Sequence, residues 1–297
     1  MTGVLLLDKP VGITSNHALQ AAKRLYRAEK AGHAGTLDPL ASGLLPVLLG
    51  DATRFSGYLL EAAKEYAAEI RLGLTTNTAD AEGEVLEQRP VDVSEADVLA
   101  VLERFRGVQK QVPPMHSALK RAGTPLYVLA RRGESVERAP RTIEIFALDL
   151  LGFSEDRAAV TVQCSKGTYI RTLAEDIGAA LGCGAHLSAL RRTATGPFRI
   201  AEAVTLDELT SMSEAERDAC LAPPDGILKQ FPIVRLEAEA ESRFRHGQAV
   251  AAPGLQVATF RVYGAHGRFL GLGTATEAGG LLPKRLMGED HNDPPTG

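Results

Sequence analysis

The residues best suited to chemistry lie in segment 32–50, GHAGTLDPLASGLLPVLLG, where one acid, Asp38, stands in a loop rich in glycine and proline. The loop leads into an apolar run, and a carboxylate on a loop anchored by a rigid strand is a common catalytic arrangement. The segment contains no second acid, no Ser–His pair and no cluster of metal ligands. If Asp38 is catalytic, it acts as a lone nucleophile or base. The alternative is a turn residue, because Asp-Pro is a common turn dipeptide.

Length and composition favour a globular protein with two domains. At 297 residues the chain exceeds the usual size of one domain, and 44% hydrophobic residues can bury a substantial core. No apolar run approaches membrane-spanning length, and the first residues lack the pattern of a signal peptide. We therefore expect a cytoplasmic protein that does not associate with membranes. The three cysteines are Cys164, Cys183 and Cys220; they are widely spaced, suit a reducing compartment and form no zinc pattern.

Charge is distributed unevenly along the chain, although the net charge is only −4. Segment 104–141 holds nine Lys and Arg residues against two acids, whereas segment 201–225 holds seven acids and one base. A charge run is usually a solvated face, but so many bases in a segment rich in loop signals favour phosphate binding. The sequence therefore indicates a phosphate-bearing partner for the basic segment.

Periodicity and capping signals predict an α+β body. Ser15 and Thr168 are expected to be N-caps, and Ser94 with Asp97 forms a capping box. Helices are expected at 15–26, 51–63, 94–105 and 169–181. Strands are expected at 4–7, 44–49, 64–72, 84–87, 142–151, 158–164 and 186–192. In the third of these strands the alternation places Tyr66 on the buried face.

The last quarter of the chain is expected to form a separate, smaller domain. Pro223-Pro224 and the acidic stretch mark a boundary, and short apolar runs separated by glycine follow it. We assign 1–230 to a catalytic body, with a basic insertion at about 104–142, and 231–287 to a small β domain. Residues 288–297 are expected to form a disordered tail.

Seven blocks of sequence resemble the TruB family of tRNA pseudouridine synthases, and they occur in the family's order. They are KPVGITS at 9–15, the segment 32–50, KEY at 64–66, PPM with SALK within 113–120, SKGTYIRTL at 165–173, GCGAHLSALRR at 182–192 and PKRL at 283–286. Any one block is weak evidence, whereas all of them together are specific. The resemblance implies the pseudouridine synthase fold, with a mixed, mainly antiparallel central sheet flanked by helices and loops. It also implies a small C-terminal PUA-like β domain.

The resemblance implies an isomerase that converts uridine 55 in the T loop of tRNA to pseudouridine, with Asp38 as the catalytic carboxylate. Breaking the C1′–N1 bond and rejoining the uracil through C5 needs no redox step, group donor or metal, so no cofactor or metal is expected. Arg171 resembles the arginine that pairs with this aspartate and keeps it ionised. The alternative is a solvated helix arginine. However, a cation at a helix start opposes the macrodipole, so a nearby anion is expected.

Tyr66 resembles the active-site tyrosine that stacks on the uracil and is a candidate base; the alternative is a core tyrosine. His33 is similar to the histidine that helps to displace the target base, although a lone loop histidine is more often a surface residue. Asp80 fits a supporting acid. The remaining pocket positions implied by the resemblance are Lys9, Lys166, Tyr169 and Leu190, the last of which would also pass as ordinary strand core.

Two positions depart from the family's pattern. Asn77 stands where an acid is common, and His116 follows Pro113-Pro114-Met115 where Tyr or Phe is common. The first change removes a carboxylate, and the second is expected to weaken stacking at that point.

The partner implied by the resemblance is tRNA, gripped by the basic insertion and the PUA-like domain. No protein partner is expected, and a monomer is the simplest assembly. The alternatives are an RNA-binding or tRNA-folding chaperone without chemistry, a guide-RNA-dependent relative, and a hydrolytic N-glycosidase that releases uracil. Asp38, Tyr66 and Arg171 together argue against a pure binder, and the integral SALK lobe argues against guide dependence.

Overall fold

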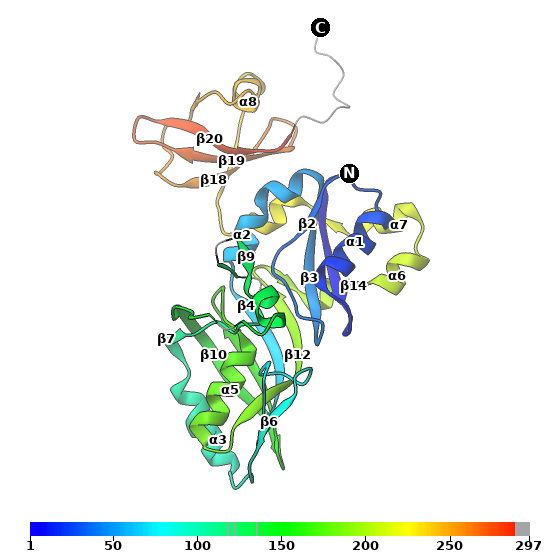
Figure 1. Cartoon of the computed structure of the whole chain (residues 1–297). Coiled ribbons are helices and arrows are strands. Elements are labelled where there is room, and N and C mark those ends of the chain that lie inside the picture. The colour runs from blue at the N-terminus through cyan, green and yellow to red at the C-terminus, as the bar shows by residue number, and fades with distance from the viewer. Residues whose placement is uncertain (118, 122, 135, 289–297) are drawn as a thin grey trace.

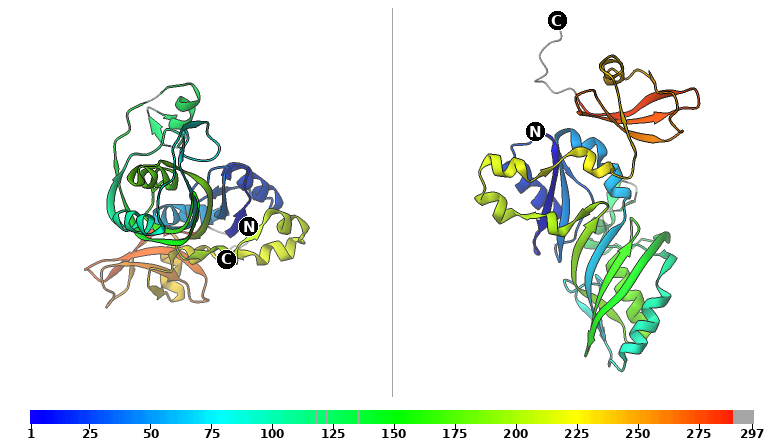
Figure 2. Two further views of the ribbon diagram at one scale, coloured as in Figure 1. Left: turned by 90° about the horizontal axis from the view of Figure 1, so that it is seen from below. Right: turned by 180° about the vertical axis from the view of Figure 1, so that it is seen from behind.

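The computed structural model describes residues 1–117, 119–121, 123–134 and 136–288 and shows an elongated α+β molecule (Figure 1). A large mixed sheet runs through the body, and a smaller sheet forms the C-terminal end. Figure 2 shows from behind that this smaller sheet and the end formed by α3 and β10 lie at opposite ends of the molecule. The predicted tail falls on residues 289–297, which lie outside the described residues.

The large sheet has the strand order β14-β1-β3-β12-β4-β11-β10-β7. These strands are β14 Val204–Thr205, β1 Gly3–Lys9, β3 Ala41–Leu49, β12 Ala185–Thr195, β4 Lys64–Leu72, β11 Arg157–Cys164, β10 Arg141–Ser154 and β7 Gly107–Gln111. Three short strands pair at its margins, namely β2 Ala31–His33, β13 Phe198–Arg199 and β15 Leu221–Ala222. Neighbours along the path are antiparallel except β12 with β3 and β1 with β14. The prediction of a mixed, mainly antiparallel sheet is confirmed.

Helices flank this sheet and occupy the loops around it. They are α1 Ser15–Leu25, α2 Ser56–Glu61, α3 Glu95–Arg104, α4 Leu126–Arg131, α5 Ile170–Leu181, α6 Leu206–Ser211, α7 Glu214–Ala219 and α8 Ala238–Arg245. The 3-10 turns are η1 Gly50–Phe55, η2 Ile200–Glu202 and η3 Pro224–Leu228. Two hairpins stand apart, β5 Leu74–Thr76 with β6 Val85–Gln88, and β8 Lys120–Arg121 with β9 Thr124–Pro125.

Separate apolar cores lie on the two halves of the sheet. In one, α3 and α5 place Val98, Leu173 and Ile177 against the strand residues Ile70 and Val160. In the other, α1 packs its alanines and Leu19 on β1 and β3. The predicted alternation of 64–72 is confirmed, since Ala68, Ile70 and Leu72 are buried. Both cores include Tyr66 at their margin, so the active region expected from the sequence lies where the two halves meet.

Of the three predicted N-caps, one is confirmed and two are wrong, although α1 and α5 begin within one residue of the predicted positions. Ser94 and Asp97 form the capping box at the start of α3. Thr14, and not Ser15, caps α1 by accepting a hydrogen bond from His17 N at 3.1 Å. The Ser15 hydroxyl instead makes two hydrogen bonds to the backbone of Leu37, a contact 22 residues away in sequence. Local capping signals could not show that this serine is used in the tertiary structure.

Thr168 is not the cap of α5. Its hydroxyl donates to Ser165 O at 3.0 Å, and Tyr169 is the N-cap residue without a side-chain bond to the helix. The start of α5 is held from outside: Tyr169 N donates to the Gln111 side chain at 2.8 Å, and that side chain donates back to Tyr169 O at 3.1 Å. Gln111, the last residue of β7, therefore takes the place of a side-chain cap at the start of α5.

The basic segment 104–142 includes β7, which is an edge strand of the large sheet. The part that leaves the sheet is therefore 112–140, with the β8–β9 hairpin and α4. This lobe emerges between β7 and β10, next to the start of α5.

The C-terminal end is a five-stranded sheet with its own apolar core. Its strand order is β16-β18-β19-β20-β17, formed by β16 Ile233–Arg235, β18 Thr259–Tyr263, β19 Phe269–Ala275, β20 Gly280–Leu286 and β17 Val250–Ala251. Phe244 of α8 is buried against it. Two aromatic pairs join this unit to the body, Phe55 with Phe269 at 5.7 Å and Tyr58 with Phe231 at 5.5 Å between ring centroids.

None of the helices within the described ranges is long and apolar enough to cross a membrane.

Phe55→Ala should lower the free energy of unfolding by about 3–5 kcal/mol, because a fully buried ring is lost from the core between η1 and the C-terminal sheet. Denaturant unfolding followed by circular dichroism measures this loss. Leu86→Ala removes a side chain that is 64% exposed and should change stability by less than about 0.5 kcal/mol. Equal effects of the two substitutions would contradict the assignment of Phe55 to the core.

Candidate functional site

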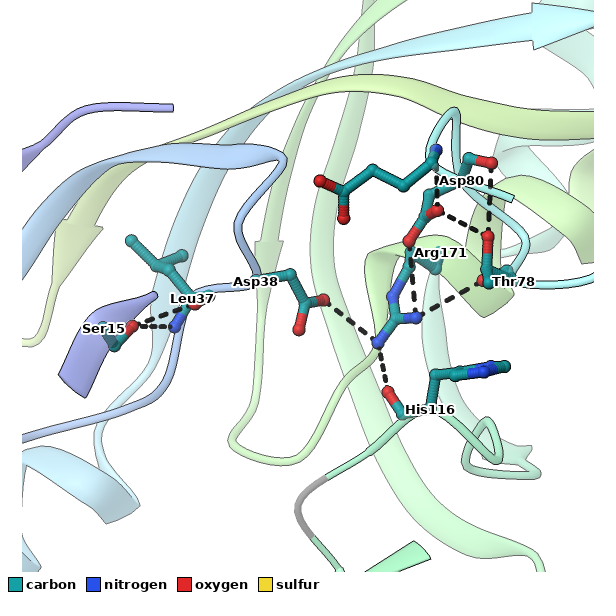
Figure 3. Close-up of polar contacts among 8 residues, drawn as sticks. Ser15, Leu37, Asp38, Thr78, Asp80, His116 and Arg171 are labelled. Atoms are coloured by element: carbon teal, nitrogen blue, oxygen red, sulfur yellow. Dashed lines mark hydrogen bonds and ion pairs between the residues drawn. The ribbon is translucent and has the colours of Figure 1, made fainter. Parts of the chain in front are cut away.

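Asp38 lies in the loop between β2 and β3, and backbone bonds from several segments hold that loop. Ser15 fixes the preceding residue, Leu37, through bonds of 2.8 and 2.9 Å (Figure 3). Gly12 N donates to Pro39 O at 2.8 Å, so the N-terminal turn is tied to the residue that follows the acid. The Asp38 carboxylate therefore projects from a loop with little freedom.

Arg171 in the first turn of α5 is the partner of Asp38. Its Nη2 lies 3.0 Å from Asp38 Oδ2, and its Nη1 lies 3.4 Å from Asp80 Oδ2. The same guanidinium donates to the backbone oxygens of Thr78 at 3.3 Å and His116 at 2.6 Å. Figure 3 shows this cation between two carboxylates from different loops. The arrangement satisfies a side chain that is only 6% exposed and supplies the anion expected at this helix start.

Asp80 is the buried counterpart of Asp38. It accepts a hydrogen bond from Thr78 Oγ1 at 2.6 Å and one from Glu82 N at 3.1 Å, which fix its orientation within the β5–β6 turn. Asn77 in the same turn uses its side-chain oxygen to accept a bond from Glu84 N at 3.0 Å. The amide at this departure from the family's pattern therefore closes the hairpin.

The pKa of Asp38 is raised from its ordinary value. Burial by surrounding protein is the main cause, while Arg171 lowers the pKa and the nearby Asp80 raises it. The Asp38 side chain is nevertheless 42% exposed, because one side of it faces a pocket. Without Arg171, two neighbouring carboxylates would share this site with no strong cation, so the guanidinium is what allows Asp38 to ionise.

The pocket beside Asp38 is built from five segments of the chain. Of the residues predicted from the sequence, Asp38, Tyr66, Tyr169, Arg171 and Leu190 line it. Among the other lining residues are Thr36, Leu60, Lys64, Ser117, Ser165 and Arg192. The acid, the two phenol rings and the cations therefore surround one space large enough to accept a flat heterocycle.

Tyr66 on β4 is partly buried, with its ring in the wall of this pocket. Burial raises the pKa of its phenol, and a hydrogen bond with Arg192 partly opposes that shift. The ring is therefore neutral and fixed, which suits a stacking surface. Tyr169 lies at the start of α5, and its pKa is also raised by burial.

Arg192 and Lys64 were missed in the sequence. The Arg192 side chain is fully buried and donates to Leu44 O at 2.7 Å and Gly35 O at 3.0 Å, which ties β12 to the Asp38 loop. The sequence held a signal for both residues. Lys64 is two positions from Tyr66 on β4, and Arg192 is two positions from Leu190 on β12. A strand period of two places each cation on the face that lines the pocket.

Four predicted substrate contacts lie away from the pocket lining: Asp80, which pairs with Arg171, and the three residues that follow. Lys9 is buried, and its Nζ donates to the backbone oxygens of Pro10 and Ile13, both at 2.8 Å, so it fixes the N-terminal turn. His33 lies on β2, where burial lowers its pKa and Nδ1 has no hydrogen-bond partner among the described residues. Lys166 pairs with Glu61 on the surface. The motifs placed these residues near the site but could not show where their side chains point.

Two further observations concern ligand sets and thiols. Across the described parts of the chain, no three His, Cys, Asp or Glu side chains come together in a way that could hold a metal ion. Cys164 is buried behind the pocket, and burial raises the pKa of its thiol to about 11.

Three sequence profiles together match almost the whole chain. One described as TruB family pseudouridylate synthase, N-terminal domain, matches residues 23–170. A second, described as the C-terminal domain of tRNA pseudouridylate synthase B, matches 171–229. A third, described as pseudouridine synthase II TruB, C-terminal, matches 232–287.

Known proteins are similar to this chain over most of their length. A tRNA pseudouridine synthase B of Dechloromonas aromatica (strain RCB) is 55% identical over 285 residues, which covers 96% of this chain and 95% of that protein. A protein of the same description from Burkholderia mallei (strain NCTC 10247) is 56% identical over 297 residues, with 97% of each covered. A solved H/ACA RNP bound to a substrate RNA containing 2′-deoxyuridine includes a chain that is 28% identical, with a TM-score of 0.73 over 97% of this chain and 85% of that one.

Arg171→Met should lower the free energy of unfolding by about 3–5 kcal/mol at pH 8, because two carboxylates lose their buried cation. Uncompensated carboxyls have folded-state pKa values above the unfolded value of 3.8, so the folded state binds the additional protons and stability falls as pH rises. The loss should therefore be smaller near pH 5. Denaturant unfolding at both pH values measures it.

Arg191→Met is the matched control, since Arg191 pairs with Asp8 outside the pocket lining at 2.6 Å and is 43% exposed. Its loss should be about 1 kcal/mol and equal at the two pH values. A pH-independent loss in Arg171→Met would contradict the proposed electrostatics of the site.

Proposed function

Since the chain belongs to the TruB family of pseudouridylate synthases, we propose that it isomerises uridine 55 in the T loop of tRNA to pseudouridine. The observation that supports this most strongly is the Asp38–Arg171 pair at the edge of a pocket lined by two tyrosines. One ionised carboxylate beside a flat, partly apolar space meets the chemical need of a reaction that detaches and re-attaches a base.

The reaction exchanges one bond to C1′ for another. The N1–C1′ bond of the uridine breaks, the uracil turns within the pocket, and C5 forms the new bond to C1′. C5 then loses its proton and N1 gains one, so the product has the mass of the substrate. Asp38 supplies the carboxylate that attacks or stabilises the detached partner, and Arg171 keeps it ionised and oriented.

The residues around the acid have separate tasks in this proposal. Tyr66 offers its ring for stacking on the uracil and is a candidate for the late deprotonation at C5, a step before which its phenol must give up its own proton. Tyr169 and Leu190 form further walls of the pocket. Arg192 fixes the Tyr66 hydroxyl and the Asp38 loop at once. A uracil that turns in place needs such rigid walls, because a loose pocket would release the detached base to water.

The target base must leave the folded T loop to reach Asp38. Flipping a stacked base costs a few kcal/mol, which stacking and hydrogen bonds in the pocket offset. His33 is proposed to act during this displacement, outside the pocket lining, and Lys166, which pairs with Glu61 on the surface, is proposed to contact a phosphate. The 112–140 lobe and the C-terminal sheet are proposed to grip the rest of the tRNA, with the protein acting as a monomer in the cytoplasm.

A guide-RNA-dependent activity is the second candidate, because the similar chain in the H/ACA RNP belongs to an RNA–protein assembly. The full-length identity of 55–56% to proteins described as tRNA pseudouridine synthase B favours a stand-alone enzyme. Conversion of bare tRNA transcript by the purified chain separates the two. A chain that requires added guide RNA would contradict the stand-alone proposal.

Asp38→Asn should reduce tritium release from C5-labelled tRNA by at least about 10³-fold, because the amide cannot act as a nucleophile or carry charge. Binding of tRNA, measured by filter retention, should change by less than about threefold. Asp149→Asn alters an exposed acid in β10 and should leave both quantities unchanged. Turnover that persists in Asp38→Asn would remove the carboxylate from the mechanism.

Binding of tRNA should weaken steeply with salt, because the exposed bases of the lobe displace counterions from phosphates. Arg132→Ala combined with Arg141→Ala removes one exposed base of the lobe and one at the adjoining start of β10, and should flatten the slope of log Kd against log salt by about 1.5. The matched control is Arg27→Ala, an exposed arginine on the opposite half of the body that pairs with Glu214. A dissociation constant independent of salt would contradict the electrostatic part of the proposal.

A further inference from the structure

Lys64 is a buried cation in the pocket wall for which the reaction described above has no use. It is the first residue of β4, two positions before Tyr66, and only 8% of it is exposed. It lines the pocket beside Leu60, which belongs to the last turn of α2. A buried ammonium is costly unless its donors are paired, so its contacts reveal what it does.

All three donors of Lys64 are directed at the end of α2. Nζ lies 3.0 Å from Leu59 O, 2.7 Å from Leu60 O and 2.6 Å from Ala62 O. The last carbonyls of a helix have no partner within it, and many helices satisfy them with a left-handed glycine. The C-cap here is Ala62 in an extended conformation, so the chain leaves the helix without that closure. The ammonium takes its place and also complements the helix dipole.

The end of α2 is a point where several parts of the site meet. Leu60 forms one wall of the pocket, and Glu61 pairs with Lys166 from the loop before α5, which forms the opposite rim. Gly196 N donates to Ala63 O at 2.9 Å, which joins the same turn to the end of β12. On its other side α2 carries Tyr58, which packs on Phe231 at the entrance to the C-terminal sheet.

We propose that Lys64 is a positioning residue for the isomerisation: by holding the three carbonyls at the end of α2, it fixes the Leu60 wall of the pocket relative to Tyr66. This inference rests on the proposed function. Lys64 acts through the backbone of α2 and needs no contact with the uracil. Its loss should therefore slow the turn of the uracil in the pocket while leaving the grip on the rest of the tRNA intact.

Burial is the main influence on the pKa of Lys64, and the titratable groups around it come from α2, β11, β12 and the loop before α5. Glu61 of α2 and Cys164 of β11 favour its charged form, whereas Arg192 of β12 and Lys166 disfavour it. The net effect lowers the pKa of Lys64 to about 8. An arginine at this position would remain charged and could still reach several carbonyls.

The test compares Lys64→Met, Lys64→Gln and Lys64→Arg by single-turnover rate, tRNA Kd and thermal midpoint. Lys64→Met should slow the single-turnover rate at least about tenfold, with the Kd for tRNA within about threefold. Lys64→Arg should recover the rate to within about threefold, and Lys64→Gln, with two donors, should fall between. Lys30→Met changes an exposed lysine that is not among the residues lining the pocket, and this variant should behave as the unsubstituted chain.

An unchanged single-turnover rate in Lys64→Met would overturn the inference, as would a loss of rate explained entirely by a weaker Kd. Should Lys64→Met fail to fold, Lys64→Gln and Lys64→Arg decide: a folded Lys64→Arg as slow as Lys64→Gln overturns it. The unsubstituted chain in the same assay keeps the two proposals apart. If the unsubstituted chain leaves uridine 55 unchanged, the proposed function is contradicted. If that chain is active and the Lys64 variants react at the same rate, only the role of Lys64 is contradicted.

Discussion

The site depends on one buried guanidinium that serves four acceptors. Arg171 neutralises Asp38 and Asp80 and also holds the backbone oxygens of Thr78 and His116. An arginine can do this because its planar fork presents several donors in fixed directions and stays charged when buried. The same contacts bring together the Asp38 loop, the β5–β6 turn and the basic lobe. The contacts that neutralise the two carboxylates are therefore the same contacts that hold the three loops together.

The large sheet makes that constraint possible. β3 and β12 are parallel neighbours, so the loop before β3 and the pocket face of β12 meet beside β4. The Arg192 side chain joins them through bonds to Leu44 O and Gly35 O. The backbones of β12 and β3 approach so closely that Gly43 has no room for a side chain, since its Cβ would lie 2.3 Å from Arg192 O. Gly43 also has a φ of +101°, which disfavours other residues. A rigid floor under Asp38 follows from this packing.

Three buried cations stabilise the backbone around the pocket. Lys9 donates to backbone oxygens of the N-terminal turn, Lys64 to those at the end of α2, and Arg192 to Leu44 O of β3 and Gly35 O of the Asp38 loop. Burying a charge is worthwhile in such places because unpaired carbonyls are also costly to bury. The pocket is thus surrounded by loops whose backbone is fixed by side chains, while its own surface remains open to a base.

The sequence alone predicted the α+β elements and the family, and it singled out Asp38, Tyr66, Asp80 and Arg171 as candidate site residues, because strand alternation, capping boxes and ordered motifs are local signals. It misassigned the caps at Ser15 and Thr168, and it placed Lys9 and Lys166 in the pocket lining. Only the tertiary structure decided these points. A side chain's direction depends on which backbone groups the folded chain brings beside it, and for Ser15 that group is the backbone of Leu37, 22 residues away. No local pattern encodes such a meeting of segments.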